Sequence, residues 1–182
     1  MSRINIVTAD TATPNQKELL DAIRGKLGIV PNFLGLLAHS TDALQAFLGL
    51  HSISENGKLD PQTRERIALA IAQGNSCEYC VSAHTAIGRK AGLSNDEMAI
   101  NRSGSSLDSY AAAGVAFATA LNEHMGEVTQ AEFDAVRAAG YSDAEIMEII
   151  THVGMNILTN LIGKATHVEI DFPKISLNSA AA

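Results

Sequence analysis

The sequence predicts an all-α protein of about seven or eight helices. No segment of any length shows the apolar and polar alternation of a β-strand, and no internal repeat is present. Start and stop signals for helices follow one another closely along the chain. Hydrophobic residues make up 46% of the chain but aromatic residues only 4%, so the core is built mainly from aliphatic side chains. Such a core suits close packing between helices.

Capping residues define the elements of the first third of the chain. Residues 1–12 are expected to form an extended arm, because the first helix begins at Thr13 and Pro14 and ends at Gly28. A later helix over residues 42–56 carries more Leu and Phe than one apolar stripe needs. We therefore expect this helix to be covered on more than one face, in the domain centre or in a subunit interface.

The centre of the predicted fold is a helical hairpin. Asp60 and Pro61 form an N-cap and first-turn pair that begins its first helix. Asn75 or Ser76, either of which is a good N-cap, begins its second helix, which continues to Gly92. The two helices are therefore antiparallel and joined by a short turn.

The longest helical stretch covers residues 143–169. It carries His152, Asn156 and Asn160 at steps of four on an apolar background. Buried amides need hydrogen-bond partners, so these residues either cap neighbouring backbone, which we favour, or form a polar wall of a pocket. Beyond this helix, residues 173–182 are expected to form an extended tail.

The chemistry of the chain is concentrated in the second helix of the hairpin. Cys77 and Cys80 are the only two cysteines, and His84 follows four residues later. With the predicted cap, both thiols fall in the first turn, where unpaired N–H groups and the helix dipole stabilise a thiolate. Such a pair is poised to reduce a substrate and close into a disulfide. His84 is within reach of a proton relay, and Glu65, equally far from the turn, could orient the imidazole.

Other interpretations of these residues remain open. A C-x-x-C pair can be inert packing or half of a zinc site, for which His84 and either Glu65 or His51 would complete the ligands. Glu65 stands between two arginines and could be a solvated salt-bridge partner. His84 could be an ordinary, partly buried histidine. His39 and His51 are expected to be core or rim residues rather than site residues.

Composition limits the possible partners and the location. The formal net charge of -7 argues against nucleic acid and anionic membranes, both of which favour a basic face. The start lacks the features of a secretory signal, and no stretch approaches the ~20 apolar residues of a membrane span. We therefore expect a cytoplasmic protein, with residues 1–182 forming a single domain. In a reducing compartment two thiols agree better with a reactive pair than with a structural disulfide.

The spacing of the four residues resembles a known family signature. Glu65, eleven residues, Cys77, two residues, Cys80, three residues and His84 match the E-x11-C-x-x-C-x3-H core of the alkylhydroperoxidase D-like branch of the carboxymuconolactone decarboxylase superfamily. The segment VPNFLGLLAHSTDALQAFLGL is similar to the lead-in of the peroxidase-related members. The resemblance covers roughly residues 28 to 172. One position departs from the best studied pattern, because Tyr79 stands where some members carry histidine.

The resemblance implies an alkylhydroperoxidase D-like helical fold and thiol-dependent reduction of a hydroperoxide. By analogy, Cys80 is the peroxidatic thiolate that becomes a sulfenic acid, Cys77 is the proton donor and resolving thiol, and His84 and Glu65 are the proton relay. From the residues alone the order of the cysteines stays open, because the helix dipole favours Cys77 and proximity to His84 favours Cys80. The resemblance further implies a dithiol protein as reductant, a trimer or hexamer, and no cofactor or metal.

Two alternative functions accompany this prediction. The other branch of the superfamily contains lactone decarboxylases without a cysteine pair; the C-x-x-C motif argues against that reaction, as does the absence of a basic cluster beyond Arg89 and Lys90. A non-catalytic redox sensor or a zinc-stabilised interaction module could share the fold. Turnover with excess reductant distinguishes a sensor from a peroxidase.

Overall fold

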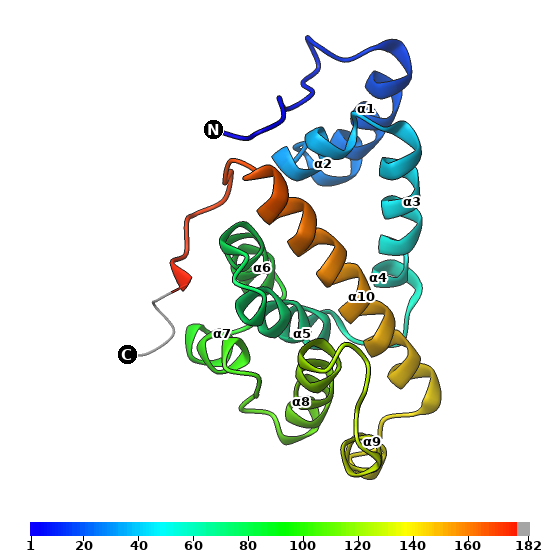
Figure 1. Ribbon diagram of the computed structural model, residues 1–182, viewed down its shortest axis with the longest axis vertical. Coiled ribbons are helices and arrows are strands. Elements are labelled where there is room, and N and C mark those ends of the chain that lie inside the picture. The colour runs from blue at the N-terminus through cyan, green and yellow to red at the C-terminus, as the bar shows by residue number, and fades with distance from the viewer. Residues whose placement is uncertain (178–182) are drawn as a thin grey trace.

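The computed structural model describes residues 1–177, and the all-α prediction is confirmed (Figure 1). This part of the chain contains ten helices, more than the seven or eight expected, because two short segments count separately. The helices are α1 (Pro14–Leu27), α2 (Asn32–Leu37), α3 (Thr41–His51), α4 (Ile53–Asn56), α5 (Pro61–Gly74), α6 (Glu78–Lys90), α7 (Asn95–Arg102), α8 (Ser109–Glu123), α9 (Gln130–Ala138) and α10 (Asp143–Thr166).

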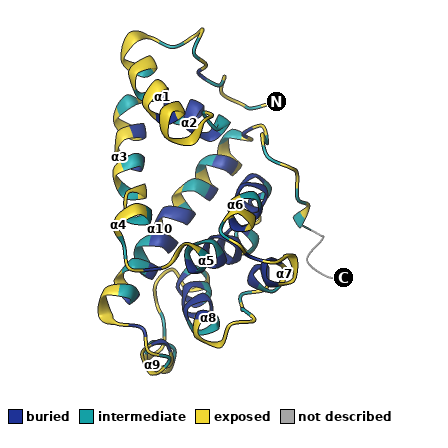
Figure 2. Ribbon diagram, turned by 180° about the vertical axis from the view of Figure 1, so that it is seen from behind, coloured by how far each residue is buried: buried dark blue, intermediate teal, exposed yellow. Residues whose placement is uncertain are grey.

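Helix α5 is the centre of the fold. It packs against α6, α7, α8 and α10, and Figure 2 shows the buried residues concentrated on these helices. Ile67 and Ile71 on one face of α5 and Leu69 on the opposite face are all fully buried. Burying each such side chain contributes about 1.5–3 kcal/mol to stability. The predicted central hairpin of α5 and α6 is therefore the element around which α7, α8 and α10 pack.

The turn between α5 and α6 differs from the prediction in its capping residue. Cys77, not Asn75 or Ser76, is the N-cap of α6, with an extended backbone at φ -100° and ψ 93°. Ser76 has a left-handed backbone with φ 54°, which reverses the chain within a short connection. The Asn75 side chain is used elsewhere, since its amide donates to Asn122 Oδ1 and Asn160 Oδ1, each at 2.9 Å. Only Cys80 therefore lies inside the first turn of α6.

The predicted helix over residues 42–56 is divided into α3 and α4 at Ser52. The Ser52 hydroxyl donates to the carbonyl of Gly49 at 2.6 Å, which competes with regular helix geometry. Within the chain, α3 buries Leu44 and Phe47 on one face only. Cover on a further face, which its composition predicts, is not seen among residues 1–177 and stays a prediction.

Helix α10 crosses the molecule beside the hairpin (Figure 1). It ends at Thr166, three residues earlier than predicted, because His167 takes a left-handed backbone with φ 50°. Against our expectation, α10 is long and apolar enough to cross a membrane by length and composition. Helix α10 is nevertheless a core helix of this fold. It packs on α5 and α8, and it buries the polar residues His152, Asn156 and Asn160.

Among the described residues, the segments before α1 and after α10 contain no α-helix and lie along the ends of other elements. In the N-terminal arm, the Arg3 amide donates to Thr166 O at 2.7 Å, at the end of α10. The described part of the C-terminal tail returns along α6, where the Ile175 amide donates to the Ser82 hydroxyl at 3.0 Å. The remainder of the predicted tail, residues 178–182, lies outside the described residues.

Candidate active site

The two cysteines at the start of α6 are joined as a disulfide. Their Cα atoms are 5.3 Å apart, and only 1% of Cys77 and 3% of Cys80 is exposed. The extended backbone of Cys77 and the helical backbone of Cys80 let the two side chains approach each other across a spacing of three. A zinc site would need both sulfurs as free thiolates, which a disulfide does not provide.

Glu65 and His84 meet as the sequence predicted. His84 Nδ1 lies 2.8 Å from Glu65 Oε2, and the side chains are 21% and 14% exposed. Because a carboxylate oxygen accepts, Nδ1 donates and Nε2 remains available for proton exchange with another group. His84 lies one helical turn beyond Cys80 on α6. The hairpin therefore places an oriented imidazole next to the cysteine pair along the same helix.

The arginines on either side of Glu65 have other partners. Arg64 Nη1 donates to the Leu59 carbonyl at 2.5 Å. Arg66 Nε donates to Glu97 Oε1 at 2.7 Å, in a pair that is almost fully buried. The interpretation of Glu65 as a salt-bridge partner of its sequence neighbours is therefore not what the structure shows.

The charge of Glu65 acts on two further histidines, His51 and His152. The His51 residue is exposed, but its ring packs against Phe47 with ring centres 5.8 Å apart. This desolvation lowers the pKa of His51, and the charge of His84 lowers it further. Burial lowers the pKa of His152 to about 4, and its Nε2 has no hydrogen-bond partner among the described residues. Both rings therefore favour the neutral form beside the Glu65 and His84 pair.

The two asparagines of α10 have different partners, and only Asn160 contacts the turn that precedes Cys77. Asn156 Nδ2 donates to the His152 carbonyl of its own helix at 2.8 Å, as the favoured capping role predicts. Asn160 does not cap backbone; its Oδ1 accepts from Asn75 Nδ2. Asn75 and Asn122 also exchange side-chain hydrogen bonds at 2.9 and 3.1 Å. This amide network links α8 and α10 to the α5–α6 turn, and sequence reasoning missed Asn75 and Asn122 because their partners are distant in the chain.

A hollow of about 360 Å³ opens beside Cys77 and the C-terminal end of α10. At Gly163 of α10, an added Cβ would lie 3.2 Å from Cys77 Sγ and 3.8 Å from Cys80 Sγ. Glycine is thus what allows α10 to pass so close to the disulfide. No signal in the sequence ties Gly163 to the cysteines, because their proximity depends on how α10 crosses α6.

Tyr79, the residue that departs from the best studied family pattern, also lines this hollow. Its hydroxyl accepts a hydrogen bond from the Phe33 amide at 3.3 Å, and its ring contacts Phe33 and Phe172. Burial raises the pKa of Tyr79, and the charge of Asp171 raises it further. Tyr79 therefore stays neutral and serves to pack α2 and the C-terminal segment against α6.

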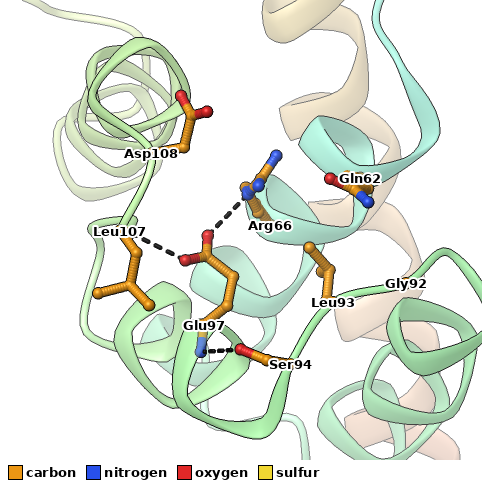
Figure 3. Close-up of a pocket in the computed structure, with 8 residues that line it drawn as sticks. All are labelled: Gln62, Arg66, Gly92, Leu93, Ser94, Glu97, Leu107 and Asp108. Atoms are coloured by element: carbon orange, nitrogen blue, oxygen red, sulfur yellow. Dashed lines mark hydrogen bonds and ion pairs between the residues drawn. The ribbon is translucent and has the colours of Figure 1, made fainter.

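A second hollow, of about 380 Å³, lies beside the Arg66–Glu97 pair (Figure 3). Burial alone would raise the pKa of Glu97, but hydrogen bonds from Ser106, Asn101 and Arg66 lower it to about 2. The Ser94 hydroxyl accepts from the Glu97 amide as the N-cap of α7, but the Glu97 carboxylate does not complete a capping box. The carboxylate instead accepts from Arg66 of α5 and from the amide of Leu107, which lies in the loop after α7. These hydrogen bonds connect α7 to both segments.

The comparisons with known proteins agree with this fold. Residues 41–123 match the model of the Carboxymuconolactone decarboxylase family. This segment begins with the first residue of α3 and ends with the last residue of α8, so it contains Glu65, Cys77, Cys80 and His84. Among curated proteins, none matches the sequence.

Solved structures share the fold over almost the whole chain. The alkylhydroperoxidase AhpD core of an uncharacterized peroxidase-related protein from Ralstonia eutropha JMP134 is 27% identical, with a TM-score of 0.81 over 93% of this chain and 92% of that one. An uncharacterized peroxidase-related protein from Silicibacter sp. TM1040 is 24% identical, with a TM-score of 0.80 over 92% and 91%. A cysteine-to-alanine variant of the debrominase Bmp8, in complex with 2,3,4-tribromopyrrole, is 19% identical, with a TM-score of 0.79 over 94% of each chain.

The helical arrangement is therefore the alkylhydroperoxidase-like fold. The predicted resemblance to the carboxymuconolactone decarboxylase family is confirmed over residues 41–123, and a solved structure of a peroxidase-related protein shares the fold of the chain.

Proposed function

We propose that this protein is a thiol-dependent peroxidase that reduces hydroperoxides through Cys77 and Cys80. The observation that supports this most directly is the 2.8 Å hydrogen bond between His84 and Glu65, one helical turn from a cysteine pair at disulfide distance. A nucleophile, a resolving thiol, a base and a group that orients the base are the parts that the reaction requires.

In the proposed reaction, His84 Nε2 accepts the proton of the Cys80 thiol while Glu65 holds the imidazole in place. The thiolate attacks the terminal oxygen of the hydroperoxide, the O–O bond breaks, and Cys80 becomes a sulfenic acid. The alkoxide that leaves takes a proton from Cys77. The Cys77 thiolate then attacks the Cys80 sulfur, forms the disulfide and releases hydroxide, which the relay protonates to water.

The assignment of Cys80 as the peroxidatic residue follows the family resemblance and fits the position of each cysteine. Cys80 lies inside the first turn of α6, where backbone amides and the helix dipole favour a thiolate. It is also the cysteine nearer to His84 along the helix. Cys77, as the N-cap, is then left as the proton donor and resolving thiol.

A complete cycle needs two electrons from a reductant, and we propose a dithiol protein in the cytoplasm for this role. A dithiol returns both cysteines to the reduced form and itself becomes a disulfide. The cytoplasm maintains such reductants in the reduced state.

The test is peroxide consumption with tert-butyl hydroperoxide and dithiothreitol. We expect turnover by the wild type, and no turnover above background by Cys80→Ser. In Cys77→Ser, treatment with peroxide and dimedone should label Cys80, because the sulfenic acid has no resolving thiol. Equal rates in wild type and Cys80→Ser would remove the proposal.

Two alternative activities are distinguished by the same variants. The similar debrominase structure shows that this fold accommodates a reaction other than peroxide reduction, so a halogenated substrate belongs in the assay panel. A lactone decarboxylase would not need the cysteines, and its activity would survive in Cys80→Ser. A redox sensor would be identified if dimedone labels Cys80 after peroxide treatment but the protein does not consume peroxide continuously in excess dithiol.

A further inference from the structure

The hollow beside Cys77 reaches only one end of the disulfide. Its lining includes Cys77, Tyr79, Gly163 and Lys164, whereas Cys80 is not among the described residues that line it. Since both cysteines are almost fully buried, a reagent that comes through this hollow meets Cys77 first. The glycine at position 163 keeps this approach open, because any side chain there would press on the sulfurs.

The charge beside the hollow is positive. Lys164 Nζ donates to the Asn75 carbonyl at 2.6 Å, which holds the ammonium group at the turn just before Cys77. Glu78 also lines the hollow, but its carboxylate pairs with Lys174 at 3.1 Å. In the described part of the chain no ion pair involves Lys164, so its charge remains available to a ligand.

We propose that the reductant's thiolate enters through this hollow, that it attacks Cys77 Sγ, and that Lys164 is the residue that positions it. The inference rests on the proposed function in that the disulfide is taken to form during turnover. It adds the direction of reductive attack, the sulfur that is attacked and the kind of reductant that is preferred.

Reduction from this side proceeds by two successive thiol–disulfide exchange steps. A thiolate of the dithiol reductant bonds to Cys77 Sγ, the Cys77–Cys80 bond breaks, and its electron pair leaves on Cys80 Sγ. The second thiolate of the reductant attacks the reductant's own sulfur in the mixed disulfide and releases Cys77. The protein gains two electrons and two protons, and the reductant becomes a cyclic or intramolecular disulfide.

Cys80 is the better leaving group of the two. Exchange is faster when the departing sulfur has a lower pKa, and the first turn of a helix lowers the pKa of a thiol. Attack on Cys77 therefore returns Cys80 directly as the thiolate, one turn from His84, in the form that the next hydroperoxide requires.

Lys164 gives the hollow a preference for anionic reductants. The incoming thiolate is itself an anion, and a second negative charge beside it gains further attraction from the ammonium group. Because Lys164 is exposed, solvent and salt weaken this attraction, so its effect on the rate is modest and depends on ionic strength. The chemical class that fits is a dithiol with an acidic group close to its sulfur atoms.

The first experiment compares two monothiols that differ in charge. Oxidised protein is reduced with 2-mercaptoethanesulfonate or 2-mercaptoethanol under single-turnover conditions, and the ratio of the two rate constants is the readout. We expect Lys164→Gln to lower the ratio by about threefold to tenfold and Lys164→Arg to retain it. Added salt should lower the ratio in every protein that keeps a positive charge at position 164, and should have little effect in Lys164→Gln. The matched control is Lys26→Gln on α1, where an exposed lysine pairs with Glu55. An unchanged ratio in Lys164→Gln would overturn the role of Lys164.

The second experiment identifies the attacked sulfur. The wild-type disulfide is treated with 2-mercaptoethanesulfonate, quenched with iodoacetamide and mapped by mass spectrometry. We expect the sulfonate adduct on Cys77 and the alkyl group on Cys80; the opposite distribution would overturn the proposed direction of attack. Neither experiment uses peroxide, so a protein that fails to consume hydroperoxide but shows these results would contradict the proposed function and leave this inference intact.

Discussion

His84 Nδ1 lies 2.8 Å from Glu65 Oε2, although the two residues are nineteen positions apart in the chain. The contact joins α5 to α6, so the candidate relay requires both helices of the hairpin. If it orients the imidazole for proton transfer, Glu65→Gln and His84→Ala should slow peroxide reduction by about a hundredfold.

The control for these variants is an exposed histidine away from the hairpin, His124→Ala at the end of α8, which should keep the wild-type rate. Circular dichroism checks that each variant remains folded. Wild-type turnover in both Glu65→Gln and His84→Ala would exclude the relay.

Mild peroxide treatment should convert the reduced protein to an intramolecular disulfide between Cys77 and Cys80. The N-cap backbone of Cys77 and the helical backbone of Cys80 bring their Cα atoms to 5.3 Å, within the range of a disulfide. Thiol counting before and after oxidation measures the change, and two free thiols per chain should become none. Retention of both thiols, or oxidation only to covalent dimers, would contradict the proposed cycle.

His152 should make the protein less stable as the pH falls below neutrality. Burial lowers its pKa from 6.5 to about 4, so between these values the unfolded state binds a proton that the folded state does not. The stability lost across this window is about 3 kcal/mol, and it is fully retained above pH 6.5. Urea unfolding from pH 7.5 to 4.5 should therefore show a flatter pH dependence in His152→Asn. An equal slope in both proteins would show that His152 does not titrate in this way.

Glu97→Gln should destabilise the protein by about 3 kcal/mol. The substitution leaves the guanidinium of Arg66 buried without its carboxylate, which is the costly way to break a buried ion pair. Asp143→Asn is the matched control, because Asp143 pairs with Arg137 on the exposed surface and such pairs contribute about 0–1 kcal/mol. Chemical unfolding at pH 7 measures both, and equal losses would contradict the distinction between the two pairs.

The protein should assemble with further copies of itself, as a trimer or hexamer. The side chains of Met147 and Leu161 on α10 are 60% and 62% exposed, and Leu158 between them is 40% exposed. Monomers rarely leave such apolar stripes open to water. Light scattering at micromolar concentration measures the mass, and a value near the 19.2 kDa of one chain would contradict this prediction. Met147→Glu with Leu161→Glu should weaken the assembly if this face forms the contact.

The local signals in the sequence determined much of the fold. Asp60 and Pro61 begin α5, Gly28 ends α1, and the periodicity of the apolar residues excluded strands. These signals act over a few residues, so they can be read without knowing the tertiary structure. The same local counting placed Glu65 opposite His84, because a short turn fixes which residues of a hairpin face each other.

The tertiary structure decided the features that depend on contacts between distant segments. The side chain of Asn75 is chemically suited to an N-cap, but it hydrogen-bonds to Asn122 and Asn160 instead. Cys77 is therefore the N-cap residue of α6. Glu97 could have completed a capping box with Ser94, but the donors that surround it come from α5 and the loop after α7. Gly163 and Lys164 belong beside the disulfide only because α10 crosses α6 at that point. In the Asn75 and Glu97 cases a distant hydrogen bond competes with a local one, and the sequence contains the local competitor alone. The position of Gly163 and Lys164 depends on the packing of two helices, which local signals do not determine.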